Sequence, residues 1–173
     1  GFVEGGGYVS IEAEHFTRAV NGQSIAWTII PGLGRTLSGM TAFPVTAPRQ
    51  LPAGGSPHLD YQLYLFEGGD VAVRAIVSPT LDVHATGLRY AVSFDDQPPQ
   101  TVNVAADTTL RAWERWVSDN AIVTVTRHRL AGPGEHVLHF WMVDPGVVLQ
   151  KLVVERAEVR PSYLGPPESF RRP

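Results

Sequence analysis

The chain has 173 residues, of which 43% are hydrophobic and 18% charged, so its composition is that of one globular domain and excludes a disordered segment. A formal net charge of −3 provides no basic surface for nucleic acid, and no apolar run reaches the length of about 20 residues that a membrane span needs. The absence of cysteine excludes disulfides, thiolate metal sites and cysteine nucleophiles. Because the chain begins at Gly1 and not at methionine, we expect a mature fragment or an excised domain.

Short apolar runs separated by glycine and proline predict a series of β-strands. In residues 71–77 the apolar side chains at odd positions share one face, and residues 121–130 alternate in the same manner, as a sheet with one buried face requires. Glycines at 67–70 and 131–134 predict tight turns between neighbouring strands. This pattern favours an all-β sandwich or barrel. The predicted strands cover residues 11–16, 25–30, 40–45, 59–66, 71–77, 88–94, 101–104, 121–130, 136–143 and 147–155.

A short helix is predicted at residues 108–120, because Trp113 and Val117 lie four positions apart and would share one face of a helix. The stretch after residue 160 is rich in proline and polar residues. We therefore predict one domain over residues 1–160 and a C-terminal tail or linker over residues 161–173.

No catalytic motif is visible. The chain has no glycine-flanked serine elbow, no HExxH zinc motif and no phosphate-binding glycine loop. The histidines are scattered without the spacing of a zinc site, and His136 and His139 are expected on opposite faces of a strand. Each histidine is therefore interpreted as a surface or hydrogen-bonded residue.

Glu12 and Glu14 form one notable pair of carboxylates, since alternate residues of a strand point to the same face. Three interpretations stay open: solvated edge residues, ligands of a structural Ca²⁺, or a general acid–base pair. The last lacks any loop pattern that would form a pocket.

Aromatic side chains indicate a different function, because sugars stack on flat aromatic faces. Trp113 and Trp141 are expected in the core. Residues that could line a carbohydrate surface are Trp27, Arg35, Trp116 and Tyr64. Arg35 follows Trp27 in a glycine-rich turn, and an arginine there could pair with the carboxylate of a uronic acid.

Long motifs cover nearly the whole chain: GGYVSIEAEHF at 6–16, WTIIPGLGRTLSGMTAFPVT at 27–46, LRYAVSFDDQPPQ at 88–100, WMVDPGVVLQKLVV at 141–154 and SYLGPPES at 162–169. Through these motifs the sequence resembles the C-terminal domain of glycoside hydrolase family 115, whose members are xylan α-1,2-glucuronidases. The resemblance implies a jelly-roll β-sandwich, similar to carbohydrate-binding modules of families 6 and 35, without the catalytic regions of the family.

The same resemblance implies an accessory role outside the cell or in the periplasm. The expected partners are a plant cell-wall polysaccharide, xylan or glucuronoxylan, and the catalytic domain of the same enzyme. The alternative is a structural docking or homodimer domain without sugar affinity. Loops at residues 31–39, 78–86 and 95–100 would form the rim of a ligand site.

For a metal, the resemblance implies structural calcium held by Glu12 and Glu14 in the EAE motif, together with an aspartate from the last strand. Gln150 stands where that aspartate is expected. An amide is a poorer Ca²⁺ ligand than a carboxylate, so the sequence departs from the family pattern at this point.

Overall fold

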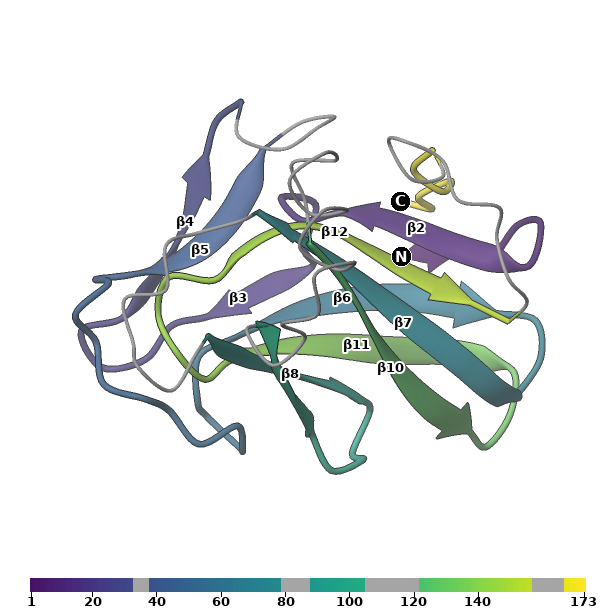
Figure 1. Cartoon of the computed structure of the whole chain (residues 1–173). Helices are drawn as coiled ribbons and strands as arrows, with labels where there is room; N and C mark the ends of the chain where they lie inside the picture. The colour runs from purple at the N-terminus through teal and green to yellow at the C-terminus, as the bar shows by residue number, and fades with distance from the viewer. Residues whose placement is uncertain (33–37, 79–87, 105–121, 157–166) are drawn as a thin grey trace, which may run out of the picture.

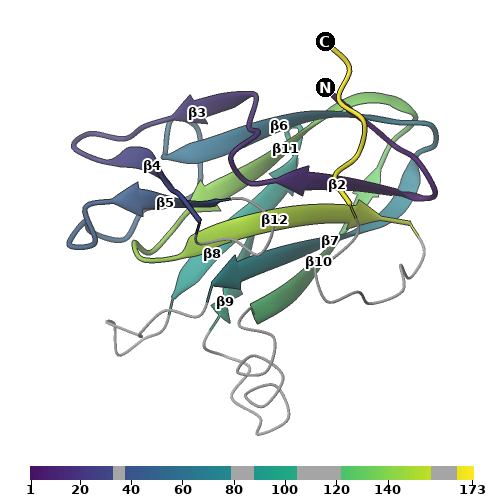
Figure 2. The same ribbon diagram turned by 90° about the horizontal axis from the view of Figure 1, so that it is seen from above.

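The computed structural model describes residues 1–32, 38–78, 88–104, 122–156 and 167–173, and these residues form two β-sheets that face each other (Figures 1 and 2). Sheet A has the order β1-β6-β11-β8-β9, with β3 also beside β6, and sheet B has the order β10-β7-β12-β5-β4, with β2 beside β12. The strands of sheet A are β1 (Phe2–Val3), β3 (Arg18–Val20), β6 (His58–Leu65), β8 (Arg89–Phe94), β9 (Gln100–Asn103) and β11 (Gly134–Met142). Those of sheet B are β2 (Tyr8–Glu12), β4 (Ala26–Ile30), β5 (Gly39–Phe43), β7 (Gly69–Ser78), β10 (Ile122–Leu130) and β12 (Val148–Glu155).

The predicted β-sandwich is confirmed, and alternation along the strands explains its core. In β7 the side chains of Val71, Val73, Ala75 and Val77 are all buried between the sheets. On the facing side, Tyr90 of β8 and Phe140 of β11, both in sheet A, stack on each other with ring centroids 4.9 Å apart and belong to the same apolar cluster. Inward-facing residues of both sheets therefore build one apolar layer, as aligned sheet packing requires.

The predicted turns at 67–70 and 131–134 are also observed. Gly69 and Gly134 have φ values of +97° and +122°, a backbone region that favours glycine. The predicted helix at 108–120 lies outside the described residues, as do Arg35, Trp113 and Trp116. Within the described residues, no helix has the length and apolarity needed to cross a membrane.

The N-terminal strand differs from the prediction of residues 11–16. β2 begins at Tyr8 and ends at Glu12, because a turn follows in which the His15 amide donates to the Glu12 carbonyl at 3.0 Å. Glu14 lies in this turn, so the inference that Glu12 and Glu14 share the face of one strand is wrong. The short strands β1 and β3 were not predicted, since two or three residues are too few to show a period.

The last residues of the chain return to its beginning. Amides of Ser169 and Arg172 donate to the carbonyls of Ser10 and Gly1 at 2.9 and 2.8 Å. The two termini consequently lie close together beside β2 (Figures 1 and 2). The predicted boundary at residue 160 falls outside the described residues and stays a prediction.

His128 gives the fold a dependence on pH. The ring is 6% exposed and lies edge-on to Phe94 in the core. Its Nδ1 accepts from the Gln100 amide at 3.3 Å and its Nε2 donates to Thr126 Oγ1 at 2.7 Å, which is the pattern of a neutral ring. Burial accordingly lowers the pKa of His128 below the ordinary 6.5.

Below pH 6.5 the unfolded chain takes up a proton at His128 that the folded chain does not yet bind, so stability falls as pH falls toward the folded pKa. We expect His128→Gln to remove this loss, which is at most about 1.4 kcal/mol per pH unit. Urea unfolding at pH 7.5 and 5.5 measures the loss as a difference in the free energy of unfolding. His15→Gln, at a half-exposed ring paired with Glu168, is the control. Equal losses in wild type and His128→Gln would contradict this account.

Candidate functional site

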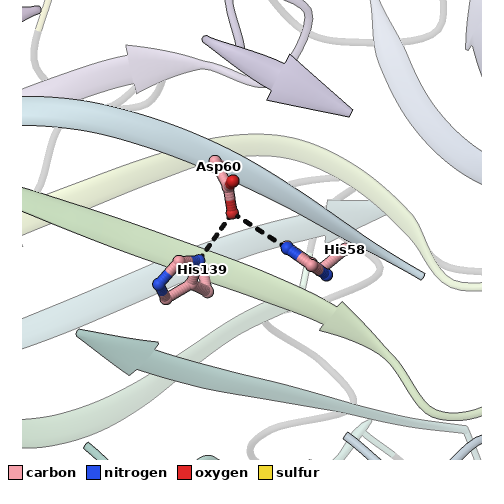
Figure 3. Close-up of side chains that lie close together, drawn as sticks. All are labelled: His58, Asp60 and His139. Atoms are coloured by element: carbon pink, nitrogen blue, oxygen red, sulfur yellow. Dashed lines mark hydrogen bonds and ion pairs between the residues drawn. The ribbon is translucent and has the colours of Figure 1, made fainter. Parts of the chain in front are cut away.

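The outer face of sheet A, on the side away from the core, carries a cluster of titratable side chains from β6 and β11. In β6, residues 59, 61, 63 and 65 point into the core, so His58 and Asp60 point outward. The antiparallel register of β11 places His139 directly opposite Asp60. Figure 3 shows the two rings converging on one carboxylate oxygen. We call His58, Asp60 and His139 the His–Asp–His cluster.

Asp60 is the centre of the cluster. Its Oδ1 accepts from Nδ1 of His139 at 2.5 Å and lies 3.3 Å from Nε2 of His58. Its Oδ2 accepts from Nε and Nη2 of Arg18 at 2.9 and 2.8 Å. Burial alone raises the pKa of the Asp60 carboxyl, but the hydrogen bond and charge of His139, the charge of His58 and the Arg18 hydrogen bond together hold it below its usual value.

Neighbouring groups fix the rings. The His58 ring lies over Trp141 with centroids 4.3 Å apart, and its Nδ1 is 2.6 Å from the Ser56 carbonyl. Trp141 is buried as predicted, but on the outer face of sheet A, where its Nε1 donates to Ser93 Oγ at 2.9 Å. Side-chain exposures of 5%, 7% and 16% for His58, Asp60 and His139 show that only His139 opens toward solvent.

A hollow adjoins the cluster on this face. Arg18, Asp60 and His139 line it together with Asp95 and Asp96 from the turn between β8 and β9. Gln62 and Val137 also line it. A guanidinium, an imidazole and several carboxylates therefore lie around one hollow.

A second hollow continues along the same two strands. Gln62 and Val137 line it as well, so the two hollows meet there. Its floor is aromatic: Tyr64 and Phe66 are 39% and 60% exposed, and their rings meet edge to face with centroids 5.4 Å apart. Phe170, Glu135 and Arg172 complete the wall. We call the joined hollows the sheet A track.

The sequence-predicted carbohydrate residues are not gathered at one place in the described residues. Tyr64 lies in the sheet A track. Trp27 is in β4 of sheet B, where its ring is partly buried against the core and its Nε1 donates to the Val20 carbonyl at 3.2 Å. Arg35 and Trp116 are outside the described residues and stay predictions.

The predicted calcium ligands have other partners. Glu12 is 4% exposed and pairs with the equally buried Lys151, whose Nζ lies 3.4 Å from Glu12 Oε1. Gln150 sits at a bulge of β12, and its amide donates to Ser78 Oγ at 2.8 Å. Among the described residues, the group that brings at least three histidine or carboxylate ligand atoms together is instead the His–Asp–His cluster.

Sequence inspection missed this cluster because its third member, His139, is far from the other two in the chain. His58 and Asp60 are two residues apart, which places them on one face of a strand, and this was the available signal. His139 joins them only through the pairing of β6 with β11. The expectation that His136 and His139 face opposite sides is confirmed, since His136 bonds Asp95 and Gly132 while His139 bonds Asp60.

Comparisons with known proteins agree with this architecture. Residues 1–168 match the family model described as the glycosyl hydrolase family 115 C-terminal domain. The fold is similar to part of a family GH115 4-O-methyl-α-glucuronidase with specificity for decorated arabinogalactans, with a TM-score of 0.67 and 18% identity over 86% of this chain and 17% of that chain. The chain thus spans about a sixth of that enzyme's length.

Smaller modules show the same fold. A family 35 carbohydrate-binding module from Clostridium thermocellum superposes with a TM-score of 0.54 and 12% identity over 85% of this chain and 98% of that chain. An exo-β-1,3-galactanase from Phanerochaete chrysosporium gives a TM-score of 0.56 and 16% identity over 84% of this chain and 28% of that chain. Among curated proteins, none matches the sequence significantly.

Proposed function

Because this chain belongs to the family of glycosyl hydrolase family 115 C-terminal domains, we propose that it is a non-catalytic accessory domain that binds a uronic-acid-bearing plant polysaccharide, with glucuronoxylan as the expected ligand. Its carbohydrate-binding-module-like fold supports a carbohydrate-related role. The proposed setting is a secreted or periplasmic enzyme in which a separate catalytic domain of the same protein supplies the chemistry.

The sheet A track is the observation that carries the proposal. It runs along β6 and β11 from the His–Asp–His cluster to Tyr64 and Phe66. Since a β-strand rises about 3.3 Å per residue, the track from Asp60 to Phe66 is roughly 20 Å long. A groove of that length suits several consecutive sugars of an extended chain better than one small molecule.

The side chains along the track offer three kinds of contact to a sugar chain: stacking, hydrogen bonding and charge pairing. The exposed faces of Tyr64 and Phe66 offer stacking surfaces for the C–H bonds of sugar rings. Gln62 between the hollows offers an amide that both donates to and accepts from hydroxyls. Arg172 at the aromatic end and Arg18 at the polar end are the cations that a uronate carboxylate would meet.

Affinity electrophoresis and calorimetry on this chain test the proposal, with glucuronoxylan, xylan lacking uronic acid and a glucuronidated arabinogalactan as ligands. We expect retardation by glucuronoxylan and a roughly tenfold loss of affinity in Tyr64→Ala, which is the loss of about 1.4 kcal/mol expected for one stacked ring. Phe43→Ala, an aromatic residue that is 40% exposed on sheet B, is the matched control.

Retardation by none of the three polysaccharides would reject sugar binding. Equal polysaccharide affinity in wild type and Tyr64→Ala would reject the track as the sugar-binding site. Trp27 and Arg35 would then be the next candidates for that site.

A structural docking or homodimer domain is the second candidate, and one feature of β10 favours it. β10 is an edge strand of sheet B, and its Val123 and Val125 are 42% and 45% exposed on the same face. An apolar strip on a sheet edge fits a contact with another folded surface. Absence of polysaccharide binding, together with concentration-dependent dimerisation in light scattering, would support this candidate.

A further inference from the structure

The hydrogen bonds of His58 leave one of its nitrogens facing an acceptor. A backbone carbonyl can only accept, so Nδ1 of His58 must carry the hydrogen that bonds Ser56 at 2.6 Å. In the neutral ring Nε2 then holds a lone pair, and it points at the Asp60 carboxylate oxygen 3.3 Å away. Two electron pairs cannot face each other stably, so this position calls for a positive charge between them, either a proton or a metal ion.

The ligand atoms have the arrangement of a metal site. One ring nitrogen from each of His58 and His139 and one oxygen of Asp60 all lie within 4.8 Å of one another. A tetrahedral ion with bonds of about 2.0–2.1 Å holds neighbouring ligand atoms roughly 3.3 Å apart. The His58–Asp60 spacing already matches that value. The 2.5 Å contact from His139 to Asp60 is a hydrogen bond, and coordination requires it to lengthen to that spacing.

Surrounding groups hold these ligands as metal sites usually do. Ligating histidines commonly donate their second ring nitrogen to a carbonyl, which His58 does through Ser56. The ligating carboxylate is in turn hydrogen-bonded, here by Arg18 on the other oxygen. His58 and Asp60 lie on one strand and His139 on the strand paired with it, so the backbone fixes their separation.

We propose that the His–Asp–His cluster binds a divalent transition-metal ion of the zinc class, with a water in the fourth position toward the hollow. Two imidazoles and one carboxylate are a zinc-type ligand set, whereas Ca²⁺ prefers oxygen ligands only. His139, the most exposed member of the cluster, and the carboxylates of Asp95 and Asp96 mark the entry side. Binding of the metal ion releases the protons on the ligating nitrogens of His58 and His139 to solvent. The cluster lies at the polar end of the sheet A track, but metal binding is measured without polysaccharide, so its failure and a failure of sugar binding are distinguishable.

Zn²⁺ calorimetry and Co²⁺ absorption spectroscopy on tag-free, chelator-treated protein test the site. We expect one ion per chain, a visible d–d spectrum of cobalt with nitrogen and oxygen ligands, and displacement of Co²⁺ by Zn²⁺. His58→Gln and His139→Gln should each weaken Zn²⁺ binding by 10-fold or more. His15→Gln, which alters a half-exposed histidine paired with Glu168, should bind as wild type does.

Absence of stoichiometric binding in the wild type would overturn the proposal, as would unchanged affinity in both His58→Gln and His139→Gln. If His58→Gln fails to fold, the wild-type Co²⁺ spectrum and the Zn²⁺ affinity of His139→Gln, a substitution at a more exposed residue, still test the metal site. Ca²⁺ is titrated in parallel, and Ca²⁺ binding that survives both substitutions would belong to a different site.

Discussion

Replacing Lys151 with methionine should destabilise the fold by about 3 kcal/mol or more, although the new side chain is similar in length and apolar. Lys151 of β12 is the direct cross-strand partner of Glu12 in β2, and the two side chains are 3% and 4% exposed. Removing the ammonium leaves the Glu12 carboxylate buried without the lysine charge 3.4 Å from it. The cost is therefore mainly that of removing the lysine charge from beside a buried carboxylate, and not that of a lost contact.

The double variant Glu12→Leu/Lys151→Met separates these two contributions. It removes both charges, so we expect it to regain most of the stability lost in Lys151→Met. A matched control exists in the pair Arg129–Asp70, which is also a direct cross-strand pair of sheet B but has both side chains 82% exposed. Arg129→Met should change the free energy of unfolding by no more than about 0.5 kcal/mol. Guanidinium unfolding of all four proteins measures these differences, and similar losses in Lys151→Met and Arg129→Met would contradict the argument.

The same variants test the proposed structural calcium. The Glu12 carboxylate has an ammonium beside it, so a calcium ion held by Glu12 and Glu14 would share that carboxylate with Lys151. If the site exists, Ca²⁺ raises the unfolding temperature, and it does so more in Lys151→Met than in wild type because the competing ammonium is gone. Unfolding temperatures that are insensitive to Ca²⁺ and to chelator in both proteins would reject the calcium proposal.

Local sequence pattern predicts the sandwich because burial in a sheet follows a period of two. β10 alternates along its length, and in β7 the odd-numbered residues from Val71 to Val77 are all buried, although Ala72 is buried too. The pattern gives a wrong strand boundary where a turn interrupts the strand. The apolar and acidic residues after Glu12 continue the alternation in the sequence, yet the chain turns at Ala13 and Glu14.

The candidate site is harder to predict because it depends on contacts between strands. Tyr64 was recognised as an exposed aromatic candidate, but Phe66 and Phe170 reach the same track from a neighbouring turn and from the chain end. Likewise, Gln150 was expected to weaken a calcium site, whereas its neighbour Lys151 turned out to supply the cation beside Glu12. Such pairings follow from strand register, which a single sequence does not specify locally.

Asp60→Asn should also destabilise the protein strongly, by about 3 kcal/mol in chelator-containing buffer. The substitution keeps the shape of the side chain and removes its charge. If the amide oxygen keeps the hydrogen bond from His139, the amide nitrogen faces the Arg18 guanidinium, and two donors then oppose each other. If the amide turns over, its nitrogen meets the His139 nitrogen that donates to Asp60, so that ring must change its tautomer to accept. In either orientation the Arg18 guanidinium loses the charge of the carboxylate that it pairs with.

Asp95→Asn is the matched control for this effect. Asp95 also pairs with a histidine, His136, and accepts from the Val137 amide, but its side chain is 41% exposed and water can replace what the substitution removes. We expect it to cost about 1 kcal/mol. Urea unfolding compares the two variants, and an Asp60→Asn loss no larger than that of Asp95→Asn would show that the cluster is not held by its central charge. Asp60→Asn is also tested for Co²⁺ binding at a low temperature at which the variant is folded. A large loss of stability together with the absence of a Co²⁺ spectrum would assign both stability and metal binding to this one buried carboxylate.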